Sequence, residues 1–115
     1  MARVRILYWK EIPVQVQAED ENERFPCCLE DRFQQGVDAI AMFDGSSGSD
    51  QYLDAWEWGE YREIGGSSQA VAQRVAEQYN RGFPGNFVER IRRLHQLGKR
   101  DPRPGGADHW ITSFE

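Results

Sequence analysis

Two adjacent cysteines, Cys27 and Cys28, carry the side chains best suited to soft-metal binding or thiol redox chemistry. A structural metal site takes about four ligands. The two histidines, His95 and His109, lie far along the chain, and no Cys-x-x-Cys spacing supports them. Adjacent cysteines also form a disulfide only in a strained ring. We therefore predict no metal site and no cofactor, and we interpret both cysteines as small apolar residues near the start of a helix.

Carboxylates are plentiful, but their arrangement is not that of an acid–base pair. Residues 19–24, with the sequence EDENER, have the composition of a solvated loop, whereas catalytic carboxylates need a shielded pocket that separates their pKa values. The stretch 46–49, which consists of serine and glycine, lacks the Gly-Lys-Ser/Thr ending of a phosphate-binding loop. No nucleophile, base and orienting residue can be grouped from the sequence, which favours a protein that is not an enzyme.

The aromatic side chains give a stronger signal. Six of them could line one surface of the domain: Tyr8, Trp9, Tyr52, Trp56, Trp58 and Tyr61. Such rings could stack the bases of single-stranded nucleic acid. Few cations lie nearby and the chain carries a net charge of −5, so nucleic acid is the weaker expectation. A small core consumes most large rings, and Trp9, Trp56 and Trp58 are the candidates for contact with a protein partner.

Basic residues concentrate in the C-terminal part of the chain. Residues 81–103 hold seven Lys or Arg against two acidic residues, so this segment carries +5 and the rest of the chain −10. A predicted helix in this segment places Arg90 and Arg93 off its apolar stripe, and the tail still carries Trp110 and Phe114. Three interpretations stay open: a solvated helix face, a contact with an anionic protein or a second copy of the chain, and a contact with nucleic acid phosphate.

A different hypothesis places a small ligand between sheet and helices. Tyr8, Arg32, Asp50 and Tyr52 are the residues that could line such a pocket. A chain of 115 residues leaves little space for a closed cavity once its core is filled. We therefore place this small-molecule or enzyme hypothesis second to protein docking.

Periodicity predicts the elements that position these residues. They are strands at 3–9, 14–18 and within 57–64, and helices at 29–42, 51–56, 67–82 and 86–97. The first two strands form an antiparallel hairpin around Pro13. The pattern predicts a two-layer α+β domain in β-β-α-β-α order, with an antiparallel sheet of about three strands covered by helices. Residues 1–81 form the predicted domain, and residues 82–115 form an appended helix and an irregular tail.

Three motifs in this order make the chain resemble the bacterial family known as the virulence factor domain. They are ILYWKEIPVQV at 6–16, LEDRFQQGVDAIAM at 29–42 and GSDQYLDAW at 48–56. The positions that carry the likeness are Tyr8, Trp9, Ile12, Pro13, Gln15, Val16, Leu29, Arg32, Phe33, Ile40, Ala41, Met42, Ser49, Asp50, Tyr52, Leu53 and Trp56. The likeness covers roughly residues 4–80.

The resemblance implies a small accessory protein or a module attached to a larger one, in some cases associated with folate and corrinoid methyl transfer. It implies no catalytic residues. The chain departs from the family's pattern at residues 18–25, where acidic AEDENERF replaces a loop rich in glycine, lysine and arginine. An anion-binding role for that loop therefore does not carry over.

The sequence thus predicts a non-catalytic accessory protein that docks a larger protein through its aromatic and C-terminal surfaces, with self-association as an option. Two alternatives stay open: a small-molecule binder or enzyme-associated factor in folate or corrinoid one-carbon metabolism, and a protein that binds single-stranded nucleic acid. No apolar run approaches the ~18 residues of a membrane helix, and the N-terminus lacks a signal-peptide core. We therefore expect a cytoplasmic protein without a membrane partner.

Overall fold

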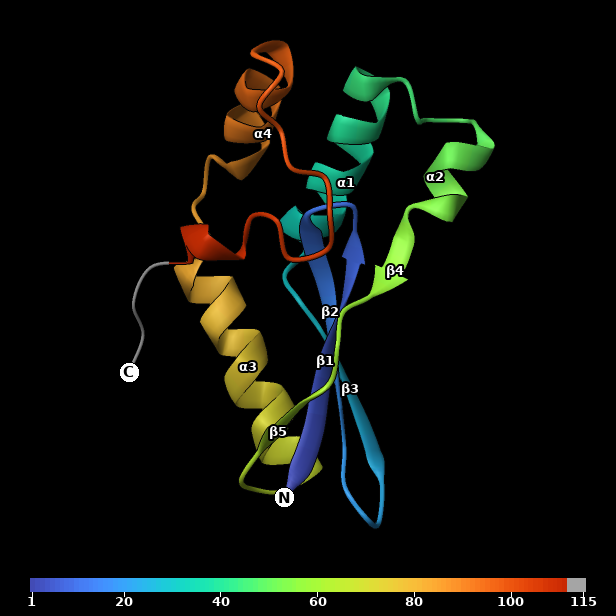
Figure 1. Cartoon of the computed structure of the whole chain (residues 1–115). Coiled ribbons are helices and arrows are strands. Elements are labelled where there is room, and N and C mark those ends of the chain that lie inside the picture. Colours follow the sequence, from blue (N-terminus) through green and yellow to red (C-terminus); the bar gives the residue numbers. More distant parts are fainter. Residues whose placement is uncertain (112–115) are drawn as a thin grey trace.

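The computed structural model describes residues 1–111, so the prediction for Phe114 lies outside the described part of the chain. The helices and strands are β1 (Ala2–Trp9), β2 (Ile12–Glu19), β3 (Arg24–Cys28), α1 (Asp31–Asp44), α2 (Asp50–Asp54), β4 (Trp56–Trp58), β5 (Arg62–Ile64), α3 (Ser68–Gly82), α4 (Phe87–Gln96) and the 3₁₀ helix η1 (Asp108–Trp110). They form an α+β fold, as predicted (Figure 1). Across these residues no helix is both long and apolar enough to cross a membrane.

The antiparallel sheet is built around the β1–β2 hairpin that the alternating polarity predicted. Its strands lie in the order β3-β2-β1-β4, and β5 pairs with β1 along the same edge as β4. The pairing shifts register between Leu7 and Tyr8, and the turn that follows places Lys10 at φ 52°. A non-glycine residue adopts this left-handed conformation only rarely. The contacts of the Lys10 side chain, described below, favour it.

The predictions of about three strands and of the order β-β-α-β-α were wrong. The described residues form five strands and four α-helices, which follow one another along the chain as β-β-β-α-α-β-β-α-α. Residues 24–28 form β3 because they pair with β2 at the outer edge of the sheet, where a proline such as Pro26 is tolerated. The predicted third strand is divided into β4 and β5, and both pair with β1.

Helices cover one face of the sheet. α3 packs across β1, β2 and β3, α1 packs on β2, and α4 packs on α1. The interior between these layers is built from apolar side chains, including the fully buried Val4, Val16, Phe33, Val37, Val71 and Val75. In Figure 1, α3 runs beside the sheet, while α1 and α4 lie at the end that carries the β1–β2 turn. The polar clusters described below gather at this end.

Some of the helices begin and end at the serine and glycine residues expected from the sequence. Gly45 ends α1 in the left-handed conformation, at φ 85°, and the Ser67 hydroxyl accepts a hydrogen bond from the Ala70 amide at the start of α3. Asn86 precedes α4 but its side chain does not cap the helix. Its Oδ1 instead accepts a hydrogen bond from Arg90 Nε at 3.0 Å, so this asparagine orients a surface arginine.

The other face of the sheet carries arginines stacked on aromatic rings. The Arg5 guanidinium lies 4.1 Å from the centre of the Trp58 ring and 4.7 Å from that of Tyr61, and the Arg3 guanidinium lies 4.4 Å from the same tyrosine ring. Cation–π contacts of this kind contribute about 0.5–1 kcal/mol each at exposed sites. The rings are therefore already covered by cations of the same chain.

Candidate protein-binding site

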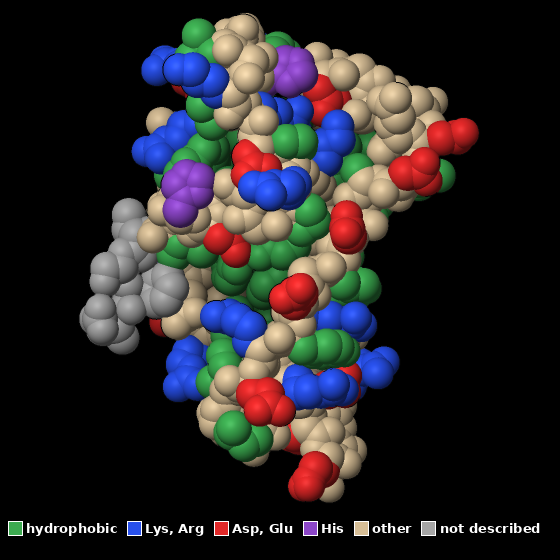
Figure 2. All heavy atoms as spheres, viewed as in Figure 1, with side chains coloured by type: hydrophobic (Ala, Val, Ile, Leu, Met, Phe, Trp, Pro, Cys, Tyr) green, Lys and Arg blue, Asp and Glu red, His purple; other side chains and the backbone are tan. Residues whose placement is uncertain are grey.

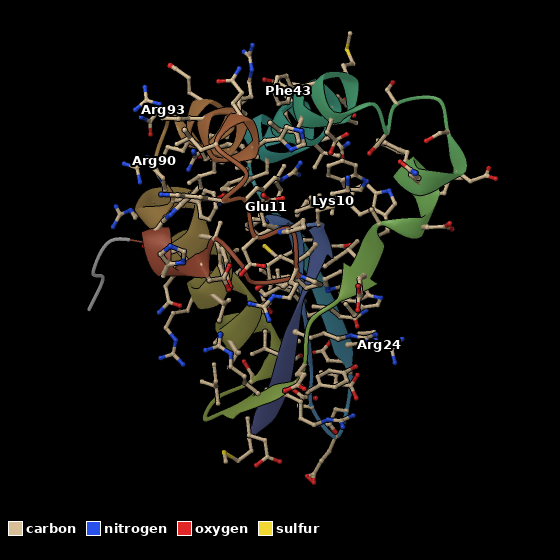
Figure 3. All side chains as sticks on the ribbon, turned by 45° about the horizontal axis from the view of Figure 1, so that its top comes forward. Lys10, Glu11, Arg24, Phe43, Arg90 and Arg93 are labelled. Atoms are coloured by element: carbon tan, nitrogen blue, oxygen red, sulfur yellow. The ribbon has the colours of Figure 1, made fainter. Side chains whose placement is uncertain are left out.

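A hollow of about 430 Å³ lies between α4 and η1, and it brings together three residues that the sequence singled out. Arg90 and Arg93 contribute from α4 and Trp110 from η1. The rest of its wall consists of Asn86, Glu89 and Leu94. Figure 3 shows both arginine side chains extending from α4 on the side away from the β1–β2 turn. We call this feature the α4 hollow.

The helical repeat and two local contacts position these side chains. Phe87 and Ile91 bury one face of α4, which leaves Arg90 and Arg93, three positions apart, as neighbours on the exposed face. The Arg90 guanidinium is held by Asn86 and lies 5.5 Å from the centre of the Trp110 ring. The hollow thus has a fixed cation beside an aromatic wall.

The charge of the hollow is only partly neutralised. Within residues 1–111, neither Arg90 nor Arg93 forms an ion pair. Arg92 is also exposed and lines an adjoining surface together with Arg93. In Figure 2, Lys and Arg side chains gather at the upper left over α4, while acidic side chains lie at the upper right over α2. The hollow can therefore receive an anionic group through charge-assisted hydrogen bonds.

A second cluster, which the sequence did not predict, lies at the β1–β2 turn. Arg100 donates two hydrogen bonds to the Glu11 carboxylate, at 2.7 and 2.9 Å, and a third to Asp44 Oδ2 at 3.0 Å. Lys10 Nζ donates to the same Asp44 oxygen at 2.7 Å and to the Ser46 hydroxyl at 3.0 Å. We call these five residues the turn cluster.

The turn cluster is nearly sealed from solvent. The side chains of Arg100, Glu11 and Asp44 are 7%, 3% and 3% exposed. Burial raises the pKa of Asp44, but the hydrogen bonds from Lys10, Ser46 and Arg100 outweigh burial and bring this pKa down to about 2. Burial likewise lowers the pKa of Arg100, and its hydrogen bonds to the two carboxylates more than restore it. Asp44 and Arg100 are therefore ionised near neutral pH.

A third cluster joins the sheet, α3 and η1. The hydroxyls of Tyr8 and Tyr79 both donate to Asp108 Oδ2, at 2.6 and 2.9 Å. Burial is the main cause that raises the pKa of both tyrosines above its ordinary value. The charge interaction with Tyr79 and then that with Asp108 add to it for Tyr8, and the charge of Asp108 adds to it for Tyr79, so the hydroxyls stay protonated. Among the described residues, Asp108 Oδ1 is buried without a hydrogen-bond partner. We call this feature the tyrosine cluster.

Comparison with known proteins shows which family the chain belongs to. Residues 7–94, about three quarters of the chain, match the family described as "Virulence factor". The chain belongs to the virulence factor family. No curated protein and no solved structure matches it. The match includes Arg90 and Arg93 and extends beyond residue 80, where the resemblance in the sequence motifs ends.

The boundary of the virulence factor match divides each cluster. Glu11 and Asp44 of the turn cluster lie inside it, whereas Arg100 follows it. In the tyrosine cluster the two tyrosines lie inside, whereas Asp108 follows it. Trp110 of the α4 hollow also lies beyond the matched residues. The segment after the match therefore supplies one component of every cluster.

The four residues considered for a small-ligand pocket contact different parts of the described structure. Tyr8 belongs to the tyrosine cluster. Arg32 donates to backbone carbonyls at the C-terminal end of α3, at 2.8–3.2 Å, and so acts as a cap for that helix. The Tyr52 hydroxyl donates to a carboxylate of α1 at 3.2 Å, and Asp50 is exposed at the start of α2. The structure does not bring these four side chains together.

The three tryptophans considered for partner contact differ in exposure. Trp9 is fully buried and its Nε1 donates to the Tyr52 carbonyl at 2.9 Å. Its assignment to a binding surface was wrong, because the ring fills the space between the β1–β2 turn and α2. Trp56 and Trp58 are partly exposed, but the Trp58 ring lies beneath the Arg5 guanidinium. The tryptophans therefore do not form one surface.

The cysteines lie at the end of β3, shortly before α1 begins at Asp31, and thus near the start of a helix as predicted. Cys28 is exposed and Cys27 is partly buried; burial and the neighbouring thiol raise the pKa of Cys27. Over residues 1–111 no group of three or more His, Cys, Asp or Glu is placed to hold a metal ion. His95 packs edge-on against the Phe43 ring, 5.2 Å between centres.

Proposed function

We propose that this member of the virulence factor family is a non-catalytic, protein-binding protein and that its partner binds at the α4 hollow. The observation that carries the proposal is the convergence of Arg90, Arg93 and Trp110 around one hollow. Arginine and tryptophan are the residue types most enriched among those that dominate binding energy at protein interfaces. Here they come from two separate segments and meet at the surface.

The chemistry of the hollow favours an acidic protein segment as the partner. An arginine presents a planar fork that matches a carboxylate in two parallel hydrogen bonds, and Arg93 has no ion-pair partner within residues 1–111. Small-molecule pockets are lined mostly by apolar side chains, whereas four of the six residues that line this hollow are exposed polar or charged residues. The partner thus presents Asp or Glu beside an apolar group that contacts Trp110.

The other polar groups support a non-catalytic role. In the turn cluster every charged side chain has an opposite charge within 3.0 Å, and in the tyrosine cluster both hydroxyls serve as donors. The rings on the open sheet face are covered by Arg3 and Arg5, which makes them poor platforms for the bases of single-stranded nucleic acid. These contacts favour protein docking over the alternatives.

A charge-reversal experiment tests the proposal. Tagged full-length wild type, R90E/R93E and R24E/R81E are used to capture proteins from cells of the native host, and the captured proteins are quantified by mass spectrometry. The control pair lies in β3 and α3, is exposed, and changes the net charge by the same amount. We expect a partner that wild type and control retain and that R90E/R93E loses at least tenfold, which corresponds to about 1.4 kcal/mol.

Equal capture by all three proteins would contradict the proposal. Light scattering on the same three proteins shows whether the partner is a second copy of the chain, because the acidic part of one copy could meet the α4 hollow of another. In that case R90E/R93E would have a lower mass than wild type and the control. Cross-links from the captured partner should lie on a segment that contains Asp or Glu.

A further inference from the structure

The segment after α4, residues 97–111, lies across the virulence factor domain as a strap. In Figure 1 it descends from the end of α4, passes the β1–β2 turn and ends in η1 beside the C-terminal end of α3. Before η1 it contains no helix or strand. A tight turn fixes its path, since a Cβ added at Gly106 would lie 2.4 Å from the Asp101 carbonyl oxygen. We call residues 97–111 the strap.

Two ionic side chains attach the strap to the domain, in addition to the apolar Ala107, Trp110 and Ile111, which pack on the core. Arg100 is received by the carboxylates of Glu11 and Asp44, and Asp108, eight residues later, is received by the hydroxyls of Tyr8 and Tyr79. All four receiving residues lie inside the virulence factor match, and both received residues lie outside it. The domain therefore supplies two receptors for the strap, Glu11 and Asp44 for the Arg100 side chain and Tyr8 and Tyr79 for the Asp108 side chain.

The first receptor is selective for a guanidinium group. Glu11 takes two parallel hydrogen bonds from Arg100, and Asp44 takes the third from another nitrogen of the same group. An ammonium group cannot reproduce this planar arrangement. Without Arg100, two nearly sealed carboxylates would face one lysine, and a buried charge without a partner is strongly destabilising. The receptor thus requires a guanidinium from some segment of chain.

The second receptor is selective for a carboxylate. Both tyrosine hydroxyls donate to a single oxygen of Asp108, and the shift of both tyrosine pKa values to higher pH keeps them donors. Gly105 lies at φ 82°, and a Cβ added there would be 3.8 Å from the Tyr8 hydroxyl. The chain before the aspartate therefore passes within van der Waals distance of the receptor, in a left-handed backbone conformation that favours glycine.

We propose that the two receptors form one peptide-binding site, which recognises an extended segment with an arginine and, eight residues later, an aspartate. The strap occupies this site in cis. A partner segment with the same two groups binds in trans by displacing it. This site is separate from the α4 hollow, yet the two are coupled because Trp110 belongs to the strap and lines the hollow. Displacement of the strap withdraws Trp110 from the hollow.

The attached strap competes with a free peptide for the two receptors. A covalently attached segment competes at an effective concentration that reaches the millimolar range, so the wild-type chain binds a free segment weakly. Loss of the two charged groups weakens the attachment of the strap, whose apolar residues still pack on the core, without removing any receptor residue. The inference can therefore be tested on the full-length chain.

The probe is a fluorescent peptide with the sequence of residues 97–111, LGKRDPRPGGADHWI, titrated against full-length R100A/D108A and wild type by fluorescence anisotropy. We expect saturable binding to R100A/D108A that is at least tenfold tighter than binding to wild type. The peptide carrying R100K or D108N should bind at least tenfold more weakly than the native peptide. If R100A/D108A does not fold, the milder R100K/D108N chain replaces it.

Receptor variants complete the test. Adding E11Q to the R100A/D108A chain should weaken the native peptide at least tenfold, whereas adding E21Q, the same charge change at an exposed position of the β2–β3 loop, should leave its affinity unchanged. Equal binding to wild type and R100A/D108A, or no loss with the altered peptides, would overturn the inference. Neither result concerns the Arg90 and Arg93 experiment, so this inference and the proposed function can fail separately.

Discussion

Replacement of Asp44 by asparagine is the sharpest test of the turn cluster. Asp44 Oδ2 accepts hydrogen bonds from both Lys10 and Arg100. Asparagine keeps the size of the side chain but removes its charge. Arg100 then loses one of its two counter-charges, and the partly buried Lys10 loses its ion-pair partner. We expect D44N to fold and to have a lower free energy of unfolding than wild type.

The pKa of Asp44 sets the magnitude. This pKa is about 2 in the folded protein, against about 3.8 without the surrounding contacts. A folded-state pKa below the unfolded one contributes stability that is present above the unfolded pKa and is lost as the pH falls through the folded pKa. The difference corresponds to about 2 kcal/mol at pH 7 and about 1 kcal/mol at pH 3. The deficit of D44N should follow the same course.

Urea denaturation followed by tryptophan fluorescence measures this deficit at pH 7, 4 and 3. The matched control is D38N, since Asp38 is exposed on the same helix, and we expect it to change stability by less than about 0.5 kcal/mol. Two results would refute the reasoning: a D44N protein as stable as D38N at pH 7, or a deficit that does not shrink between pH 7 and pH 3.

Two further predictions concern packing and thiol chemistry. G36A should lower the free energy of unfolding by about 1–2 kcal/mol in urea denaturation, because the added Cβ would lie 2.4 Å from the Phe87 ring and force α1 from α4. The control is G85A, whose Cβ meets no atom within 4 Å and which should cost less than about 1 kcal/mol. Equal effects of the two variants would contradict this packing. The reaction of the thiols with an aromatic disulfide reagent at pH 8, followed by absorbance, should show a fast phase from Cys28 and a slower phase from Cys27, because burial raises the pKa of Cys27. The variant C28S should remove the fast phase. If the fast phase persists in C28S, the assignment of the two phases is wrong.

Local patterns predicted the parts of the fold that depend on neighbours in sequence. The alternation in the first two strands predicted the hairpin, because each strand has one buried and one partly exposed face. Helical spacing predicted α1, α3 and α4. It also placed Arg90 and Arg93 on the exposed side of α4, and the isolated Trp110 in the tail indicated a docked segment. These are the residues that the α4 hollow brings together.

The remaining features depend on pairings between distant residues. Glu11 and Arg100 are separated by 89 positions, and nothing in the local sequence of either one indicates the other. β3 escaped prediction because it is an outer strand with a proline, so neither alternation nor β-propensity marks it. Trp9 was placed at the surface because strand alternation does not reveal that α2 and the turn close over its ring.

The left-handed backbone at Lys10 sets two demands at one position. Glycine would relieve the conformational cost at φ 52°, about 1 kcal/mol for a residue with a Cβ. The same change would remove the ammonium group from Asp44 and Ser46. Backbone geometry at position 10 therefore favours glycine, whereas the ion pair with Asp44 favours lysine. The β1–β2 turn keeps the strained lysine because its side chain links the turn to α1.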